Sequence, residues 1–128
     1  MNRNKLAVGI IIKENKILLL KRANTRFDEG KWCAVNETME EGESPEQTII
    51  RGIKEEINSD LISHKFLFEH PEKEFLGYIF LCKINEHFKL NNYESSEFGW
   101  FTFEEAMNLD LAFDYRNLLK KIKEKKLF

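Results

Sequence analysis

Glycine, proline and cysteine are all scarce in this sequence of 128 residues, which contains 6 Gly, 2 Pro and 2 Cys. So little glycine and proline excludes collagen-like repeats and low-complexity linkers, and a hydrophobic content of 42% excludes intrinsic disorder. The two cysteines lack zinc-ligand spacing and need no structural role. We expect Cys33 and Cys82 to be reduced and buried, and, since we see no secretory leader, we expect a cytoplasmic protein.

The sequence also lacks long apolar runs and an excess of charge of either sign. Its longest apolar runs, 10–12 and 17–20, fall far short of the ~20 residues that cross a bilayer, so we expect no membrane partner. The 20 basic and 22 acidic residues give a net charge of −2, which argues against a nucleic-acid partner but allows a small anionic ligand. The length suits a single domain over 1–128, as a monomer or a homodimer.

Apolar and β-branched runs predict strands on both sides of a central helix. The expected strands are 5–12 and 17–22, which form a hairpin, a short segment at 32–35, and strands around 65–69, 75–84 and 97–101. Polar loops are expected at 23–31 and 36–43. The pattern predicts an α/β (α+β) fold in which a mixed β-sheet is sandwiched between helices.

The central helix has clear start and stop signals. Ser44 can cap its first turn, Gln47 completes a capping box, and Asn58 tolerates the left-handed conformation in which helices often end. A second capping box at 102–105 predicts a short helix, and apolar residues at helical spacing predict a terminal helix around 115–122.

Helical spacing divides the central helix into an apolar arc and a polar stripe. The arc, expected to face the core, holds the isoleucines at positions 49, 50, 53 and 57. The opposite stripe holds Thr48, Gly52 and Glu55. Glu56 lies at the border of the apolar arc, next to a second carboxylate in the sequence.

Glu55 and Glu56 lie in the last helical turn, where the helix dipole disfavours negative charge. Hard oxygen ligands of this kind bind Mg²⁺ together with substrate phosphates. A divalent cation could compensate the two charges, and Arg51, one turn earlier, is another candidate. A solvated acidic face without any ligand is the alternative that helix geometry leaves open.

The segment from Glu37 to Ser59 resembles the sequence box of the Nudix hydrolase family (MutT-like), whose pattern is G-x5-E-x7-R-E-U-x-E-E-x-G-U, with U a bulky aliphatic residue. The chain keeps five of the nine specified positions: Glu43, Arg51, Ile53, Glu55 and Glu56. It departs from the pattern at the other four: Glu37, Gly52, Asn58 and Ser59. The N-terminal hairpin and the tail at 97–105 also resemble the family.

The resemblance implies a Nudix fold with its box at about 37–59. It implies a metal-dependent diphosphohydrolase that cleaves a nucleoside diphosphate linked to another moiety, with Mg²⁺ (or Mn²⁺) as cofactor and a small-molecule nucleotide or diphosphate as substrate. Glu55 and Glu56 match the family's metal-binding carboxylates. Glu43 and Arg51 match the pair that braces the loop against the helix.

Gly52 stands where the family has a further metal-binding glutamate. We hypothesise that Glu37 fills the resulting gap and offers its carboxylate to the same metal, and that Glu97 adds another. Glu37, Glu56 and Glu97 are therefore the candidate catalytic residues, with Glu56 and Glu97 as candidate general bases. A solvated loop residue is the alternative for Glu37.

A nucleotide substrate needs cations for its phosphates and a flat apolar surface for its base. Arg22, Arg26 and Lys31, around the loop before the box, are the candidates for the phosphates. The aromatic candidates for the base are Phe27, Tyr78, Phe80 and Phe113, although aromatic residues at strand spacing are also typical of a core. Two other functions stay open: a catalytically impaired Nudix-fold domain that binds a nucleotide for regulation, and an enzyme resembling isopentenyl diphosphate isomerases.

Overall fold

The computed structural model describes residues 4–128, which form seven strands and three helices. In chain order the elements are β1 (Asn4–Lys13), β2 (Lys16–Arg22), β3 (Trp32–Cys33), β4 (Val35–Thr38), α1 (Pro45–Ile57), β5 (Leu61–Pro71), β6 (Phe75–Ile84), β7 (Ser95–Phe101), α2 (Phe103–Met107) and α3 (Tyr115–Glu124).

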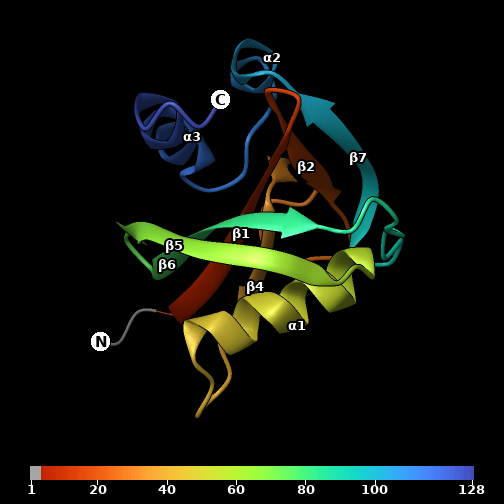
Figure 1. Ribbon diagram of the computed structural model, residues 1–128, viewed down its shortest axis with the longest axis vertical. Helices are drawn as coiled ribbons and strands as arrows, with labels where there is room; N and C mark the ends of the chain where they lie inside the picture. The colour runs from red at the N-terminus through yellow and green to blue at the C-terminus, as the bar shows by residue number, and fades with distance from the viewer. Residues whose placement is uncertain (1–3) are drawn as a thin grey trace.

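The strands form one mixed sheet between the helices (Figure 1). The order is β3-β2-β1-β6-β5, with β4 also paired to β1 and β7 to β2. β1 runs parallel to β6 and antiparallel to both β2 and β4. Helix α1 lies on one side of the strands and α2 and α3 lie on the other. The expected α/β (α+β) sandwich is confirmed.

The β1–β2 hairpin turns at Glu14 and Asn15, whose φ angles are 52° and 64°. Two successive residues with positive φ are typical of the type I′ turn, whose twist matches that of the flanking strands. Ile12 then pairs with Ile17, so the expected hairpin is confirmed.

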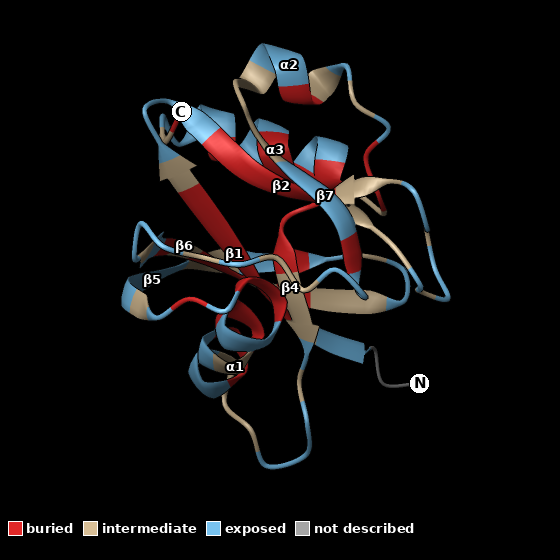
Figure 2. Ribbon diagram, turned by 90° about the vertical axis from the view of Figure 1, so that its right-hand side faces the viewer, coloured by how far each residue is buried: buried red, intermediate tan, exposed pale blue. Residues whose placement is uncertain are grey.

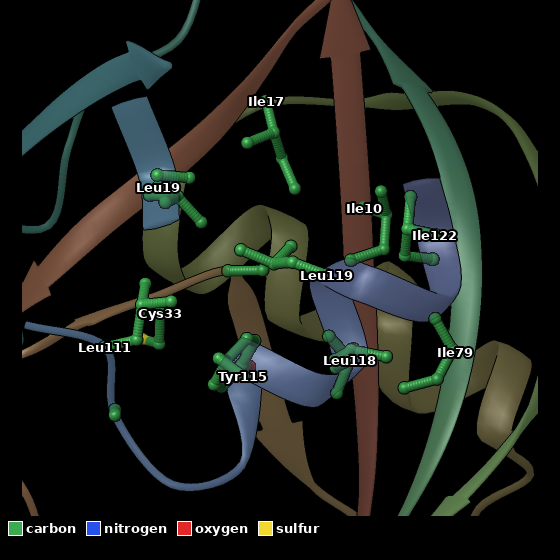
Figure 3. Close-up of a cluster of buried hydrophobic side chains, with 14 of the residues drawn as sticks. Ile10, Ile17, Leu19, Cys33, Ile79, Leu111, Tyr115, Leu118, Leu119 and Ile122 are labelled. Atoms are coloured by element: carbon green, nitrogen blue, oxygen red, sulfur yellow. The ribbon is translucent and has the colours of Figure 1, made fainter. Parts of the chain in front are cut away.

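Successive side chains of a strand point to opposite faces of the sheet, and each face has its own hydrophobic core. The buried residues lie in the central strands and in the helices that cover them (Figure 2). On one face Ile10, Ile17 and Leu19 pack against Leu119 and Ile122 of α3 (Figure 3). The other face forms the α1 cluster, which consists of Ala7, Ile11, Leu18, Leu20, Val35, Ile49, Ile53, Ile57, Phe80 and Cys82.

Helix α1 has the predicted caps at both ends. Ser44 and Gln47 form the capping box, and Asn58 ends the helix in the left-handed conformation. The loop that follows β6 then satisfies carbonyl groups of the last turn: the N–H of Lys89 donates to the Ile57 carbonyl, and that of Asn91 donates to the Glu56 carbonyl, both at 2.8 Å. These bonds hold the 85–94 loop against the carboxylate-bearing end of α1.

The buried face of α1 differs from the expected one. Ile50 is 49% exposed, whereas Thr48, Gly52 and Glu56 are buried together with the other three isoleucines of the helix. The reason is β4, which extends to Thr38 where a loop from residue 36 was expected, and packs beneath this side of the helix. Gly52 of the polar stripe therefore faces a strand, whereas Glu55 of the same stripe is exposed.

Other expectations concern the cysteines and the membrane. Cys33 and Cys82 are both buried and unpaired, as expected. Within residues 4–128, none of the helices is long and apolar enough to cross a membrane.

Candidate active site

Glu43 and Arg51 join the loop before α1 to the helix. Nε and Nη2 of Arg51 donate to the two carboxylate oxygens of Glu43 at 2.8 and 2.9 Å, and the Thr48 hydroxyl donates to Glu43 at 2.8 Å. Nη2 of Arg51 also donates to the Thr38 carbonyl at 2.8 Å. The pair therefore fixes β4, the loop and α1 relative to one another, as the box resemblance implies for these two positions.

The hydrogen bonds between Glu43 and Arg51 predict that the stability of the protein falls in acid. Hydrogen bonds from Arg51 lower the pKa of Glu43 from 4.5 to about 2. Because the pKa is lower in the folded state, the stability that Glu43 contributes is present above pH 4.5 and is lost as the pH falls towards 2. We expect the wild type to lose more stability than Glu43→Gln across this range, measured by urea unfolding at each pH. Equal losses would contradict the role of Glu43.

Glu56 is a buried carboxylate with an unsatisfied oxygen. Glu56 is only 7% exposed, and its Oε2 atom has no hydrogen-bond partner among the described residues. Burial raises the pKa of Glu56 well above its ordinary value, and the negative charges of Glu37 and Glu94 raise it further. The positive charge of Arg22 and a hydrogen bond from the Asn36 backbone act in the opposite direction.

Glu37 and Glu55 lie on either side of Arg51. Nη1 of Arg51 is 3.6 Å from Glu37 of β4 and 3.4 Å from Glu55 of α1. Burial raises the pKa of Glu37, although the charge of Arg51 opposes the shift. Glu37 is therefore a half-buried strand residue and not the solvated loop residue of the alternative interpretation, whereas Glu55 is open to solvent.

These side chains fit a divalent cation. Within residues 4–128, no three His, Cys, Asp or Glu side chains already form a complete metal cage. Mg²⁺, however, uses one or two carboxylates and keeps waters or substrate phosphates as its other ligands. The unpartnered buried oxygen of Glu56 beside Glu37 is a donor of this kind.

Near the tail of the chain, the carboxylate that acts on the site is Glu94, which sequence reasoning missed, and not the predicted Glu97. Glu97 lies in β7 opposite Lys21, and strand alternation places it on the face of β7 opposite to Trp100, whose ring packs against the α1 cluster. Glu94, just before β7, is instead the tail residue whose charge acts on both Glu56 and Glu37. The acid-x-x-Trp spacing favoured Glu97, and no local signal distinguished Glu94.

Arg22 lies close to the carboxylates and is held in place. It donates to the Phe27 carbonyl at 3.1 Å and to the Thr25 hydroxyl at 3.0 Å, and its guanidinium lies 4.8 Å from the centre of the Phe113 ring. Its charge lowers the pKa of Glu56. The exposed Arg26 stacks over the Phe27 ring at 5.1 Å.

The two strand aromatics belong to the packing of the molecule. Phe80 is 0% exposed within the α1 cluster, with its ring 5.6 Å from that of Phe66, so the prediction that Phe80 contacts substrate is wrong. Its position on β6 faces α1 because alternate residues of this strand point into the same core. Tyr78, on the same face, is half-buried with its ring 6.4 Å from that of Phe66.

A mixed sheet between helices, with a carboxylate-bearing helix braced through Arg51 to the preceding loop, defines the class of small Nudix-fold proteins. A model of the NUDIX domain matches residues 3–122. The chain therefore belongs to the NUDIX family, and as a member it is a hydrolase acting on phosphoric anhydride bonds. Enzymes of this family generally use divalent metals.

Individual relatives agree with this assignment. An ADP-ribose pyrophosphatase of Methanocaldococcus jannaschii is 30% identical over 119 residues, which cover 88% of this chain and 68% of the relative. The structure of a MutT NUDIX hydrolase from Burkholderia pseudomallei superposes with a TM-score of 0.81 at 19% identity, over 94% of this chain and 98% of that one. The NUDIX domain of Shewanella oneidensis NrtR, solved with ADP ribose, gives 0.79 at 17% identity, over 98% and 89%.

Proposed function

We propose that this protein is a metal-dependent diphosphohydrolase that cleaves a nucleoside diphosphate linked to another moiety, either a nucleoside triphosphate or a nucleotide derivative. The observation that carries the proposal is the buried carboxylate of Glu56, whose Oε2 atom has no hydrogen-bond partner among the described residues and which is coupled to Glu37 at the box of a NUDIX chain. The resemblance to an ADP-ribose pyrophosphatase and to a domain solved with ADP ribose supports a small-molecule nucleotide as substrate.

Glu55, Glu56 and Glu37 are the residues that would hold Mg²⁺ or Mn²⁺. When bound, such an ion neutralises phosphate charge and lowers the pKa of a water molecule. Burial raises the pKa of Glu56, and a carboxylate with a raised pKa is a stronger base. Glu94, whose charge acts on Glu56, is the other candidate base and takes the place predicted for Glu97, which lies on the opposite face of β7.

The proposed substrate-binding residues are Arg22 and Arg26 for the phosphates and Phe27 for the base. Guanidinium groups bind phosphate oxygens with paired, charge-assisted hydrogen bonds. Arg22 is oriented by Phe27 and Thr25 and lies near Glu56, so it can bind a phosphate close to the carboxylates. The Phe27 ring is 47% exposed and provides a surface on which a base can stack. The half-buried Tyr78 is a further candidate.

The proposal includes neither a nucleic-acid partner nor a membrane partner. It includes a cytoplasmic location, where unpaired thiols such as Cys33 and Cys82 persist. It allows a monomer or a homodimer.

The test is a screen for phosphate, which inorganic pyrophosphatase releases from the pyrophosphate product of a triphosphate and which an added phosphatase releases from the monophosphate products of substrates without a terminal phosphate. Substrates are nucleoside triphosphates, their oxidised forms, dinucleoside polyphosphates, ADP-ribose and nucleotide sugars, each with Mg²⁺ and with Mn²⁺. We expect turnover of at least one substrate that stops with EDTA and is lost in Glu56→Gln. No product from any substrate, nucleotide binding without product, or equal product from Glu56→Gln would each refute the proposal.

A further inference from the structure

Gly52 lies on the buried face of α1, directly against Glu37 of β4. A Cβ atom at position 52 would lie 2.9 Å from the Cβ atom of Glu37, closer than real Cβ atoms approach a neighbour. The Cβ atom of Glu37 is fixed by the pairing of this residue with Ala7 in β1, so it cannot move aside as the end of a flexible side chain could. Any side chain at position 52 therefore competes with Glu37 for the same space.

The unpartnered oxygen of Glu56 faces this same space. Its Oε2 atom lies 3.8 Å from the Cβ position built on Gly52, and the residue is more than nine-tenths buried. Glu37 brings a second negative charge to this point. The Glu37 side chain and the unpartnered Oε2 atom of Glu56 thus border the same space, and two coupled carboxylates of this kind form an arrangement that a divalent cation stabilises.

The Glu37 carboxylate is also oriented by its neighbours. The Thr38 N–H donates to its Oε1 atom at 3.2 Å, and Nη1 of Arg51 is 3.6 Å from the same atom. Because Arg51 is fixed by its paired hydrogen bonds to Glu43, the brace that holds the loop also positions the Glu37 side chain.

From this geometry we infer that Glu37 and Gly52 are an exchanged pair: Glu37 of β4 supplies the metal-binding carboxylate that the Nudix box pattern places on α1, at position 52. Position 52 is glycine because the Glu37 side chain occupies its space. The inference rests on the proposed function, and it adds that the metal bridges a strand and the helix in this chain.

The first test is Mn²⁺ binding, measured by calorimetry without substrate. We expect Glu37→Gln to weaken Mn²⁺ binding by on the order of tenfold or more, since altering even the groups that support metal ligands costs about this much. Glu40→Gln is the matched control, because Glu40 also lies near Arg51, at 3.9 Å, but is exposed. We expect wild-type affinity from Glu40→Gln. Equal affinities for the two variants would overturn the inference.

The second test exchanges the two residues. Gly52→Glu alone should lower the melting temperature and weaken Mn²⁺ binding, because its side chain collides with Glu37. The double variant Glu37→Gly/Gly52→Glu should recover Mn²⁺ affinity to within about threefold of the wild type, a difference well below the tenfold effect of losing a ligand. A folded double variant that binds as weakly as Glu37→Gln would overturn the exchange.

A third test examines, without metal, whether the side chains at positions 37 and 52 compete for the same space. Gly52→Ala should lower the melting temperature of the wild type and leave it unchanged or raised in a Glu37→Gly background, where the space is empty. Equal effects in both backgrounds would overturn the inference even where the double exchange fails to fold. If the wild type hydrolyses substrate with Mn²⁺ while Glu37→Gln keeps full affinity, the inference fails and Glu37 is not a metal ligand, but the proposed hydrolysis stands. If the wild type binds no Mn²⁺, both fail.

Discussion

Replacing Glu56 by glutamine is expected to abolish turnover and, at the same time, to stabilise the metal-free protein. Turnover should fall by at least about a hundredfold, because one positioned acid–base group contributes that much or more to a rate. The melting temperature in EDTA should rise, because glutamine removes a buried negative charge that is repelled by Glu37 and Glu94. One oxygen of the Glu56 carboxylate, Oε2, also has no hydrogen-bond partner among the described residues. The measurements are steady-state kinetics with Mg²⁺ and thermal unfolding followed by circular dichroism.

The pH dependence of this stabilisation follows from the sign of the pKa shift. The pKa of Glu56 is raised in the folded state, so the stability that its protonated form contributes is complete below pH 4.5 and is lost as the pH rises through the folded pKa. The advantage of Glu56→Gln should therefore grow with pH from about 4.5 upward. Glu46→Gln, an exposed acid in the first turn of the same helix, is the matched control and should leave turnover unchanged. A Glu56→Gln variant that is less stable than the wild type in EDTA would contradict the burial argument.

Phe80→Ala should destabilise the protein by about 3–5 kcal/mol, the usual cost of removing a fully buried aromatic ring. The ring belongs to the same α1 cluster as Ile49 and Ile53, so its loss leaves a cavity in the core that supports the helix with the carboxylates. Urea unfolding measures the change. KM for the best substrate, taken well below the melting temperature, should stay close to the wild-type value, because Phe80 has no exposed surface for a ligand.

Phe98→Ala provides the matched comparison for this prediction. Phe98 has the same ring, on β7, but is exposed, so its replacement should cost roughly 1 kcal/mol or less. A Phe80→Ala variant of wild-type stability with a raised KM would reinstate Phe80 as a substrate-binding residue and contradict its place in the core.

Local sequence signals were sufficient for the elements that carry the site. The capping box at Ser44 and Gln47 and the stop at Asn58 predicted the bounds of α1, and the apolar run at 75–84 predicted β6 with its observed bounds. These signals depend on hydrogen bonds and periodicity within a few residues, which is why a sequence is enough to read them. The meeting of Glu43 and Arg51 was instead implied by the resemblance to the Nudix box, and the two side chains are hydrogen-bonded.

Other features depended on segments distant in the sequence. Periodicity placed Ile50 in the core and Gly52 in solvent, but the packing of β4 under α1 reversed both. Phe80 and Phe27 are both aromatic, and only the sheet decided that the first is buried while the second is exposed. The charge of Glu94 acts on Glu56 because hydrogen bonds hold the 85–94 loop against the end of α1.

The sequence by itself therefore determined that this chain is an α/β sandwich with a carboxylate-bearing helix, and its resemblance to the Nudix box implied the brace at Arg51. Only the tertiary structure decided which carboxylates share one space. Capping, turn geometry and helical spacing are properties of neighbouring residues, whereas burial and charge coupling arise when a strand such as β4 is brought against a helix. At Gly52 the sequence shows a missing negative charge, and the fold shows that Glu37 brings one to the same place.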